Sequence, residues 1–173
     1  MSGGRVGREI REFEIGLGML MMIKEPSILS ITGIGSCIGL ALRDNQCHAS
    51  GLAHVVLPSS KQADDAYVAP GKYADKAVNF LARGLVSMGA EIQRMGAKLV
   101  GGAQVLANGG FDGHKNVESV RSELGKHNIK VIAEDVGSTY GRSMKFDTSS
   151  GEIVVRRYRQ LGGIAELKDV IVI

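Results

Sequence analysis

The spacing of hydrophobic residues predicts two helices in the part of the chain that follows residue 70. The first helical pattern begins after Pro70 and ends at Gly89, and the second stops near Asn128. The hydrophobic positions are Ala74, Ala77, Val78, Leu81 and Leu85 in the first helix, and Val117, Val120 and Leu124 in the second.

Short segments rich in β-branched and other hydrophobic residues predict strands. An apolar segment that ends at Ile23 is read as the first strand, because acidic residues precede it and no small-residue cleavage site follows it. The other predicted strands cover residues 28–32, 37–43, 48–57, 98–100, 129–133, 143–146 and 153–158. Turn residues at 44–47 and 149–151 predict hairpins. Residues 171–173 fit either a further strand or an exposed contact for another protein.

Length and composition favour one domain. A chain of 173 residues is large enough for one substantial core and small for two. With no Trp and only 5% aromatic residues, that core must consist mainly of aliphatic side chains. We expect residues 1–8 to be disordered, the polar residues 59–69 to form a loop, and residues 9–173 to form one strand-rich α/β or α+β domain.

Charge and cysteine content narrow the class of protein. The formal net charge is only +3, whereas a nucleic-acid-binding domain usually carries a basic stripe interleaved with aromatic residues. The nearest candidate, residues 156–159 (Arg-Arg-Tyr-Arg), lies in a predicted strand and is better explained as a solvated edge. Two cysteines do not form a disulfide scaffold, and no hydrophobic run approaches the roughly 20 residues of a spanning helix. The expected compartment is the reducing cytosol.

One predicted hairpin brings a cysteine close to a histidine. If residues 45–46 form a two-residue loop, the register of the two strands places Cys37 directly opposite His54. Their Cβ atoms would then be about 4.5–5.5 Å apart, within reach of a hydrogen bond between imidazole and thiol. Gln46 is a poor residue for the second loop position, and a slip of one residue would put the two side chains on opposite faces.

A paired cysteine and histidine suit nucleophilic catalysis. The pKa of a free thiol is about 8.5, and a neighbouring imidazole can accept its proton and stabilise the thiolate. The turn before Cys37 contains Gly35 and Ser36, whose backbone N–H groups can stabilise an oxyanion at an attacked carbonyl. The alternative, that Cys37 only packs in the interior, stays open because cysteine is among the most buried residue types.

A metal site is the competing chemistry for this hairpin, which also contains Cys47 and His48. At the pitch of a strand, Cys47 would lie about 23 Å from the level of Cys37, too far for shared ligation. We therefore expect no metal site, and His114 and His127 are expected at the surface.

Six short motifs in a fixed order carry a family resemblance. The two nearest the candidate pair are residues 33–40, Gly-Ile-Gly-Ser-Cys-Ile-Gly-Leu, and residues 53–58, Ala-His-Val-Val-Leu-Pro. The others are residues 70–75, 99–103, 116–118 and 133–135. The chain resembles the CheD family of chemoreceptor glutamine deamidases from about Ile15 to beyond Arg156.

The resemblance implies a single-domain α/β sandwich of mixed β-strand layers with two main helices packed on them. It implies hydrolysis of glutamine side-chain amides to glutamates on the cytoplasmic helices of chemoreceptors. It assigns Cys37 as the nucleophile and His54 as its acid–base partner. It further implies a cytoplasmic protein with no cofactor, with the CheC phosphatase as a second partner, and without nucleic-acid binding or membrane insertion.

One departure from the family pattern concerns the group that orients His54. Family members commonly have a threonine six residues before the cysteine, where this chain has Ile31. In a regular strand the neighbouring Thr32 faces the other way. Thr32 becomes the candidate only if a bulge near Gly33 re-aims it, and a backbone carbonyl is the alternative.

The role of the two glycines at residues 101–102 is also open. Gly102 is a candidate substrate contact, and close packing of backbone is the alternative. Two other functions also remain open: a non-catalytic adaptor that binds chemoreceptors or CheC, and a receptor methylesterase.

Overall fold

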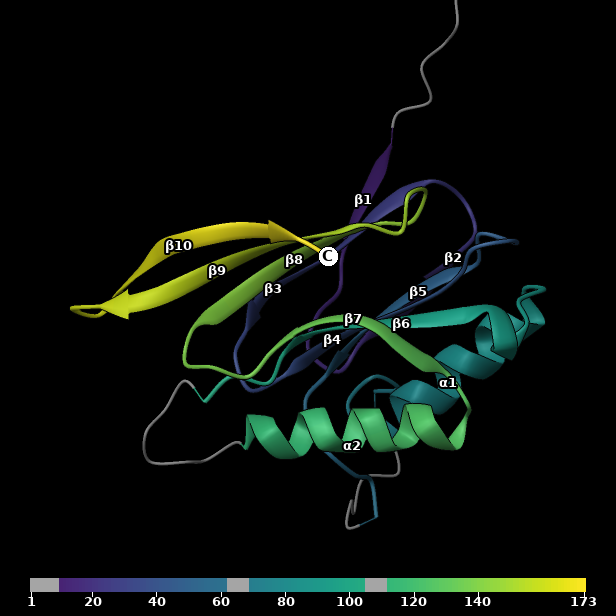
Figure 1. Cartoon of the computed structure of the whole chain (residues 1–173), viewed down its shortest axis with the longest axis horizontal. Helices are drawn as coiled ribbons and strands as arrows, with labels where there is room; N and C mark the ends of the chain where they lie inside the picture. The colour runs from purple at the N-terminus through teal and green to yellow at the C-terminus, as the bar shows by residue number, and fades with distance from the viewer. Residues whose placement is uncertain (1–9, 62–68, 105–111) are drawn as a thin grey trace, which may run out of the picture.

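The protein folds into three layers, in which a central sheet lies between an outer sheet and two helices (Figure 1). The computed structural model describes residues 10–61, 69–104 and 112–173. The predicted disordered segment 1–8 and most of the predicted loop 59–69 lie outside the described residues.

Each sheet has five strands. The central sheet contains, in spatial order, β2 (Leu20–Ile23), β5 (Ser50–Val55), β4 (Ile38–Asp44), β6 (Met95–Gly101) and β7 (Lys130–Val136). The outer sheet contains β1 (Arg11–Glu14), β3 (Ser27–Ile34), β8 (Gly141–Asp147), β9 (Ile153–Leu161) and β10 (Ile164–Val172). The β1–β3 and β6–β7 pairs are parallel and the other pairs are antiparallel.

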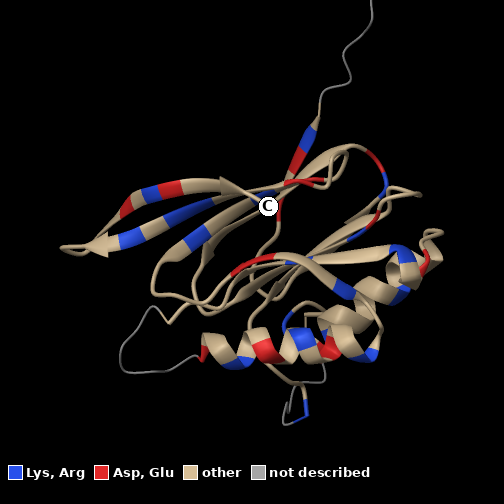
Figure 2. Cartoon of the chain, in the orientation of Figure 1, with Lys and Arg blue, Asp and Glu red and all other residues tan. Residues whose placement is uncertain are grey.

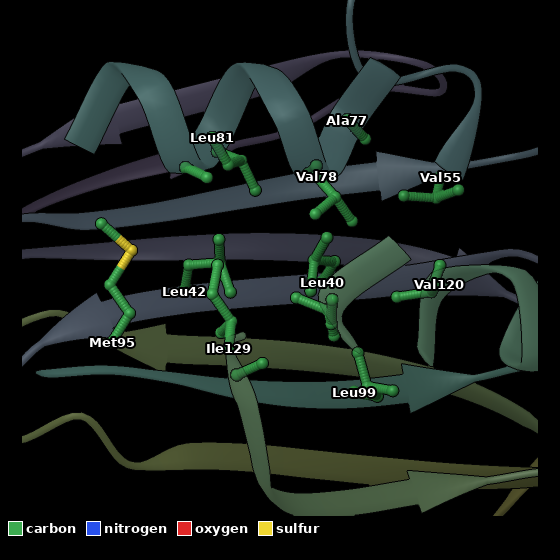
Figure 3. Close-up of a cluster of buried hydrophobic side chains, with 14 of the residues drawn as sticks. Leu40, Leu42, Val55, Ala77, Val78, Leu81, Met95, Leu99, Val120 and Ile129 are labelled. Atoms are coloured by element: carbon green, nitrogen blue, oxygen red, sulfur yellow. The ribbon is translucent and has the colours of Figure 1, made fainter. Parts of the chain in front are cut away.

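Two helices cover the free face of the central sheet, as the hydrophobic spacing predicts. They are α1 (Ala74–Ser87) and α2 (Gly113–Lys126), and a 3₁₀ turn (Ile92–Arg94) follows α1. The Asp112 carboxylate begins α2 by accepting a hydrogen bond from the Lys115 N–H at 3.2 Å. Figure 3 shows aliphatic side chains of both helices, among them Val78 and Val120, meeting those of the central sheet, such as Leu40.

A second core lies between the two sheets. It contains Ile31 and Ile34 of β3, Met144 and Phe146 of β8, and the central-sheet residues Ala41 and Leu52. Strands β4 and β5 are therefore buried on both faces, with alternate residues directed to the helices and to the outer sheet. The predicted α/β sandwich of mixed strand layers with two main helices is confirmed.

The sequence pattern missed part of the outer sheet. Strand β1 was not predicted, because Arg-Glu-Phe-Glu has a single hydrophobic residue and its polar residues face solvent at the sheet edge. The predicted last hairpin extends further, since β9 continues to Leu161 and pairs with β10. This pairing answers the open question about the C-terminal residues, because Ile171 and Val172 belong to β10.

The predicted register of the β4–β5 hairpin is wrong by two residues. Asp44 pairs with Ala49, so the loop has four residues, and His54 faces Gly39 rather than Cys37. The Asp44 carboxylate accepts hydrogen bonds from the N–H groups of Gln46 and Cys47 and so stabilises this longer turn. A shift of two residues preserves the face on which each side chain lies, so Cys37 remains on the same face as His54.

Charged residues of both signs are interspersed over the sheets and helices (Figure 2). On β9, Arg157 points inward and binds Asp135, while Arg156 lies with Tyr158 on the opposite face. The prediction that these residues lie on a sheet edge is wrong, because β9 lies between β8 and β10. None of the helices in the described part of the chain is both long enough and apolar enough to span a bilayer.

The buried Asp44 carboxylate ties the β4–β5 turn to the 3₁₀ turn. The Arg94 guanidinium donates to it at 2.8 Å, and the Glu91 N–H donates at 3.0 Å. Burial by itself would raise the pKa of Asp44, but the Arg94 guanidinium and the three backbone donors hold that pKa well below its usual range.

We predict that Asp44→Asn lowers the free energy of unfolding by roughly 3 kcal/mol at neutral pH, because it leaves buried donors facing an amide. The native pKa of Asp44 is depressed, so its contribution is fully present above the unfolded-state value of about 4 and is lost progressively as the pH falls from that value through the native pKa. Urea unfolding of wild type and variant from pH 7 to pH 3 measures this, and the difference between the two stabilities should begin to narrow below about pH 4.

The matched control is Asp147→Asn. Asp147 also accepts two turn N–H groups, from Ser149 and Ser150, but no ion pair to it occurs among the described residues. The free energy of unfolding of this variant should fall by only about 1 kcal/mol. Equal losses in both variants would contradict the importance of the Arg94 pair.

Candidate active site

Cys37 lies where the chain crosses from the outer sheet to the central sheet. The crossing consists of residues 35–37, which join the end of β3 to the start of β4. A bulge between Ile31 and Ile34 bends β3 before the crossing, and Gly33 in it has φ of 68°. Cys37 is half-buried and packs against the core between the sheets, without a disulfide.

The carbonyl groups of the crossing are held by hydrogen bonds. The Ala103 N–H donates to the Gly35 carbonyl at 2.8 Å, and the Asn116 Nδ2 donates to the Ser36 carbonyl at 2.9 Å. In a trans peptide the N–H points away from the carbonyl of the same unit. The N–H groups of Ser36 and Cys37 are therefore directed away from these anchors, and no oxygen atom among the described residues accepts them. Two such N–H groups together can stabilise an oxyanion.

His54 lies on β5 and is only 3% exposed. Its backbone is held by the segment that precedes β2, since its N–H donates to the Met19 carbonyl and its carbonyl accepts from the Gly18 N–H, each at 3.0 Å. Neither ring nitrogen has a hydrogen-bond partner among the described residues. Burial lowers the pKa of His54, and the nearby backbone of Ile15 offsets this only in part. The imidazole is thus neutral at pH 7 and can accept a proton.

Cys37 and His54 are diagonal neighbours on the face of the central sheet that meets the outer sheet. Gly39 faces His54 directly, and Cys37 precedes Gly39 by two residues. Diagonal positions of an antiparallel pair are about 7–8 Å apart, and Gly39 contributes no side chain of its own between them. No hydrogen bond joins the two side chains, because both ring nitrogens are unpartnered. Side chains in this arrangement can approach one another by rotation.

Gly39 is also a point of close approach between the two sheets. A Cβ atom there would lie 2.2 Å from the Met144 Sδ of β8 and 3.4 Å from the side chains of Ile31 and Ile34. The absence of a side chain at this position therefore allows the outer sheet to pack closely beside the pair.

Comparison with known proteins identifies the family. The family model described as "CheD chemotactic sensory transduction" matches residues 56–157. A Thermotoga maritima protein named "Chemoreceptor glutamine deamidase CheD" is 37% identical over 155 residues, covering 89% of this chain and 95% of the relative. The chain belongs to the CheD family. A "Probable chemoreceptor glutamine deamidase CheD" from Symbiobacterium thermophilum is 40% identical over 147 residues, covering 82% of this chain and 89% of the relative.

In this CheD-family chain Thr32 does not contact His54. The bulge near Gly33 is present, but the Thr32 hydroxyl donates to the Glu14 carboxylate. Thr32 lines a cavity with Glu12 and Glu14 of β1, on the solvent side of the outer sheet. Ile31, the residue at the family's threonine position, points into the core and is fully buried. The prediction that Thr32 orients the imidazole is therefore not met, and the Ile15 backbone, which affects the pKa of His54, is a group of the predicted alternative type.

Gly102 supports the crossing instead of offering its N–H to a substrate. Its N–H donates to the Cys37 carbonyl at 2.8 Å, and a Cβ on it would lie 2.3 Å from the Val117 side chain of α2. The close-packing alternative of the sequence analysis describes this glycine correctly. For Gly35 and Ser36, the predicted oxyanion role stays a prediction. The geometry of the crossing suits the N–H of Ser36, together with that of Cys37 in place of Gly35.

Two residues outside the predicted set of site residues contribute to the site. The Asn116 side chain donates to the Ser36 carbonyl and is buried. The signal available in the sequence was a polar asparagine next to Val117, on the hydrophobic face of a predicted helix. Gly101 has φ of 123°, and a Cβ on it would lie 2.2 Å from the Cys37 carbonyl oxygen. In the part of the chain that is described, no three His, Cys, Asp or Glu residues are grouped so that they could hold a metal ion.

We predict that Gly101→Ala lowers the free energy of unfolding by roughly 1–3 kcal/mol, because the new methyl group would collide with the Cys37 carbonyl at a positive φ. Gly125→Ala in α2 is the control, since nothing lies within 4 Å of a Cβ there. The free energy of unfolding of that variant should rise by about 0.5–1 kcal/mol. Urea unfolding measures both, and a stable Gly101→Ala protein would contradict the close approach.

We predict that free Cys37 reacts slowly with iodoacetamide at neutral pH. Burial raises the pKa of the Cys37 thiol, and its own N–H offsets this only in part. The thiolate therefore forms above the usual value of about 8.5, and the alkylation rate should rise with pH through that region. Mass spectrometry of a Cys47→Ala variant follows this residue alone. If the pH midpoint of the alkylation rate lay below that of glutathione, the result would contradict a Cys37 thiol that is neutral at rest.

Proposed function

We propose that this chain is a cysteine-dependent glutamine deamidase of chemoreceptors, with Cys37 as nucleophile and His54 as acid–base partner. The observation that carries the proposal is the position of this pair, on one face of the central sheet beside the N–H groups of Ser36 and Cys37, which donate to no oxygen atom among the described residues. The 37% identity to a protein named as such a deamidase, over 89% of this chain, supports the choice of substrate. The protein would act in the cytoplasm, on the cytoplasmic helices of the receptor.

In the first half of the reaction a neutral pair is activated by the substrate. The Cys37 thiol transfers its proton to His54 as the sulfur attacks the amide carbon of the glutamine side chain. The carbonyl oxygen becomes an oxyanion that accepts hydrogen bonds from the N–H groups of Ser36 and Cys37. His54 then gives the proton to the departing nitrogen, and the C–N bond breaks to release ammonia and leave a thioester on Cys37.

In the second half water replaces the sulfur. His54, again neutral, takes a proton from a water molecule as its oxygen attacks the thioester carbon. The C–S bond breaks, the proton returns to the sulfur, and the glutamine has become a glutamate. The lowered pKa of His54 suits this role, because the ring is free to accept a proton in both halves.

Space for a protein substrate lies beside Ile34 and Gly35, which precede Cys37 in the chain. A cavity of about 400 Å³ on the outer-sheet side of the crossing is lined by residues 32–35, by the first residues of β8, and by Tyr158, Gln160 and Ala165 of the β9–β10 hairpin. Residues flanking the target glutamine on a receptor helix would contact this surface. Binding of the CheC phosphatase, implied by the family resemblance, is a further part of the proposal.

The decisive experiment is incubation of a receptor cytoplasmic fragment with wild type, Cys37→Ala and His54→Ala. Wild type should release ammonia and add about 1 Da per converted glutamine, as measured by mass spectrometry. Cys37→Ala should be inactive because it lacks the nucleophile, and His54→Ala should lose roughly 10²–10⁴-fold in rate. Cys47→Ala is the matched control, since Cys47 packs on the helix side of the central sheet and should retain full activity.

The same preparation separates the alternatives. A folded wild type that binds the receptor fragment or CheC but releases no ammonia would replace the deamidase with an adaptor. Release of methanol from receptor methyl esters, lost in Cys37→Ala and without conversion of glutamine, would replace it with a methylesterase.

A further inference from the structure

The side-chain amide of Asn116 joins two segments of the candidate site. Its Nδ2 donates to the Ser36 carbonyl at 2.9 Å and to the Val56 carbonyl at 3.0 Å. Ser36 directly precedes Cys37, and Val56 follows His54 by two residues. One NH₂ group of α2 therefore holds both the crossing that bears the cysteine and the end of the strand that bears the histidine.

The orientation of this amide is fixed by its partners. Two carbonyl oxygens can be satisfied only by the NH₂ group, because an amide oxygen in its place would face two acceptors. Asn116 is 2% exposed, so water does not compensate for a lost bond. Its Oδ1 is buried without a hydrogen-bond partner among the described residues, so the two donated bonds are the polar contacts that the side chain makes there.

We propose that Asn116 is a positioning residue that aims the Cys37 N–H at the oxyanion. The carbonyl of Ser36 and the N–H of Cys37 belong to one trans peptide, so fixing the carbonyl toward α2 directs the N–H to the opposite side. Donation to this carbonyl also polarises the peptide and strengthens its N–H as a donor. The inference rests on the proposed function for its kinetic consequences, but the orientation of the N–H is testable without a substrate.

The neighbouring peptides are held independently. Ala103 binds the Gly35 carbonyl and Gly102 binds the Cys37 carbonyl, both through backbone N–H groups. Loss of the Asn116 bonds therefore releases the peptide between Ser36 and Cys37 while the crossing stays attached on both sides. The expected effect is on the oxyanion donor more than on the fold or on the sulfur.

The test compares Asn116→Asp and Asn116→Ala with wild type. Aspartate has the same shape but places a carboxylate oxygen against two carbonyls, and alanine removes the donor without repulsion. We expect kcat for deamidation of the receptor fragment to fall about 10–100-fold, with KM within about threefold. Alkylation of Cys37 by iodoacetamide passes through no oxyanion. The Cys37 N–H affects its rate only by partly offsetting the raised pKa of the thiol, so the alkylation rate should change much less than kcat.

The control for a general loss of stability is Val120→Ala. Val120 lies four residues along the same helix, is fully buried in the helix-side core and touches no part of the reaction. This variant should be less stable than wild type but keep its kcat. If Asn116→Asp does not fold, Asn116→Ala carries the comparison. Equal loss of deamidation and alkylation in the Asn116 variants, or an unchanged kcat, would overturn the inference while the proposed function stands.

A second readout separates the two hypotheses. The backbone amide resonance of Cys37 in a ¹H–¹⁵N spectrum should shift in the Asn116 variants and stay nearly constant in Val120→Ala. If wild type converts no glutamine yet this resonance moves, the deamidase proposal fails and the orientation of the N–H by Asn116 is upheld. An unmoved resonance in both folded Asn116 variants overturns it.

Discussion

The central sheet is covered on both faces, and the properties of the candidate site depend on that burial. Strands β4 and β5 present one set of side chains to the helices and the other to the outer sheet. Desolvation disfavours a charge on any side chain in the layer between the sheets. His54 is accordingly held neutral by a lowered pKa, and Cys37 is held as a thiol by a raised one. The fold itself thus sets the protonation state of the pair.

A buried ion cluster fastens the two sheets near the crossing. Asp135 of β7 accepts from Arg142 of β8 at 2.9 Å and from Arg157 of β9 at 2.7 Å. Burial would raise the pKa of Asp135, but the two guanidinium groups lower it. Arg142 pairs in register with Ile34, immediately before the crossing, so the cluster fixes the outer sheet where the chain leaves it. Removal of one member would leave a buried charge without its partner, which is far more destabilising than an exposed ion pair is stabilising.

Periodicity predicts faces better than it predicts register. The alternation along β4 and β5 correctly places Cys37 and His54 on one face, because a side chain can change face only through a slip of an odd number of residues. The loop length could not be predicted, since it depends on how the Asp44 carboxylate binds N–H groups within the turn. The prediction that Thr32 orients His54 failed for a similar reason. The hydrogen-bond partner of Thr32, Glu14, lies on a strand that hydrophobic spacing does not reveal.

Contacts between distant segments were beyond the sequence pattern altogether. Asn116 is 80 residues from Ser36 and 60 from Val56, and its two bonds exist only because α2 packs over the end of the central sheet. A glycine at position 101 indicates conformational freedom of the backbone. The sequence does not show that this freedom is needed for close approach to the Cys37 carbonyl. Helices, strands and faces follow from local physics, whereas the donors around the crossing follow from the assembled layers.

The separation of Cys37 and His54 has a chemical consequence. A preformed thiolate–imidazolium pair reacts with many electrophiles, because the thiolate is present before any substrate binds. Here both groups are neutral at rest, and the ring nitrogens of His54 have no partner among the described residues. In the proposed mechanism, proton transfer becomes favourable only when a bound amide brings the sulfur, the imidazole and the N–H groups of the crossing together. Such a site keeps a reactive sulfur inert toward other electrophiles and acts only where its whole surface is engaged, which suits an enzyme that must select particular side chains on a large protein.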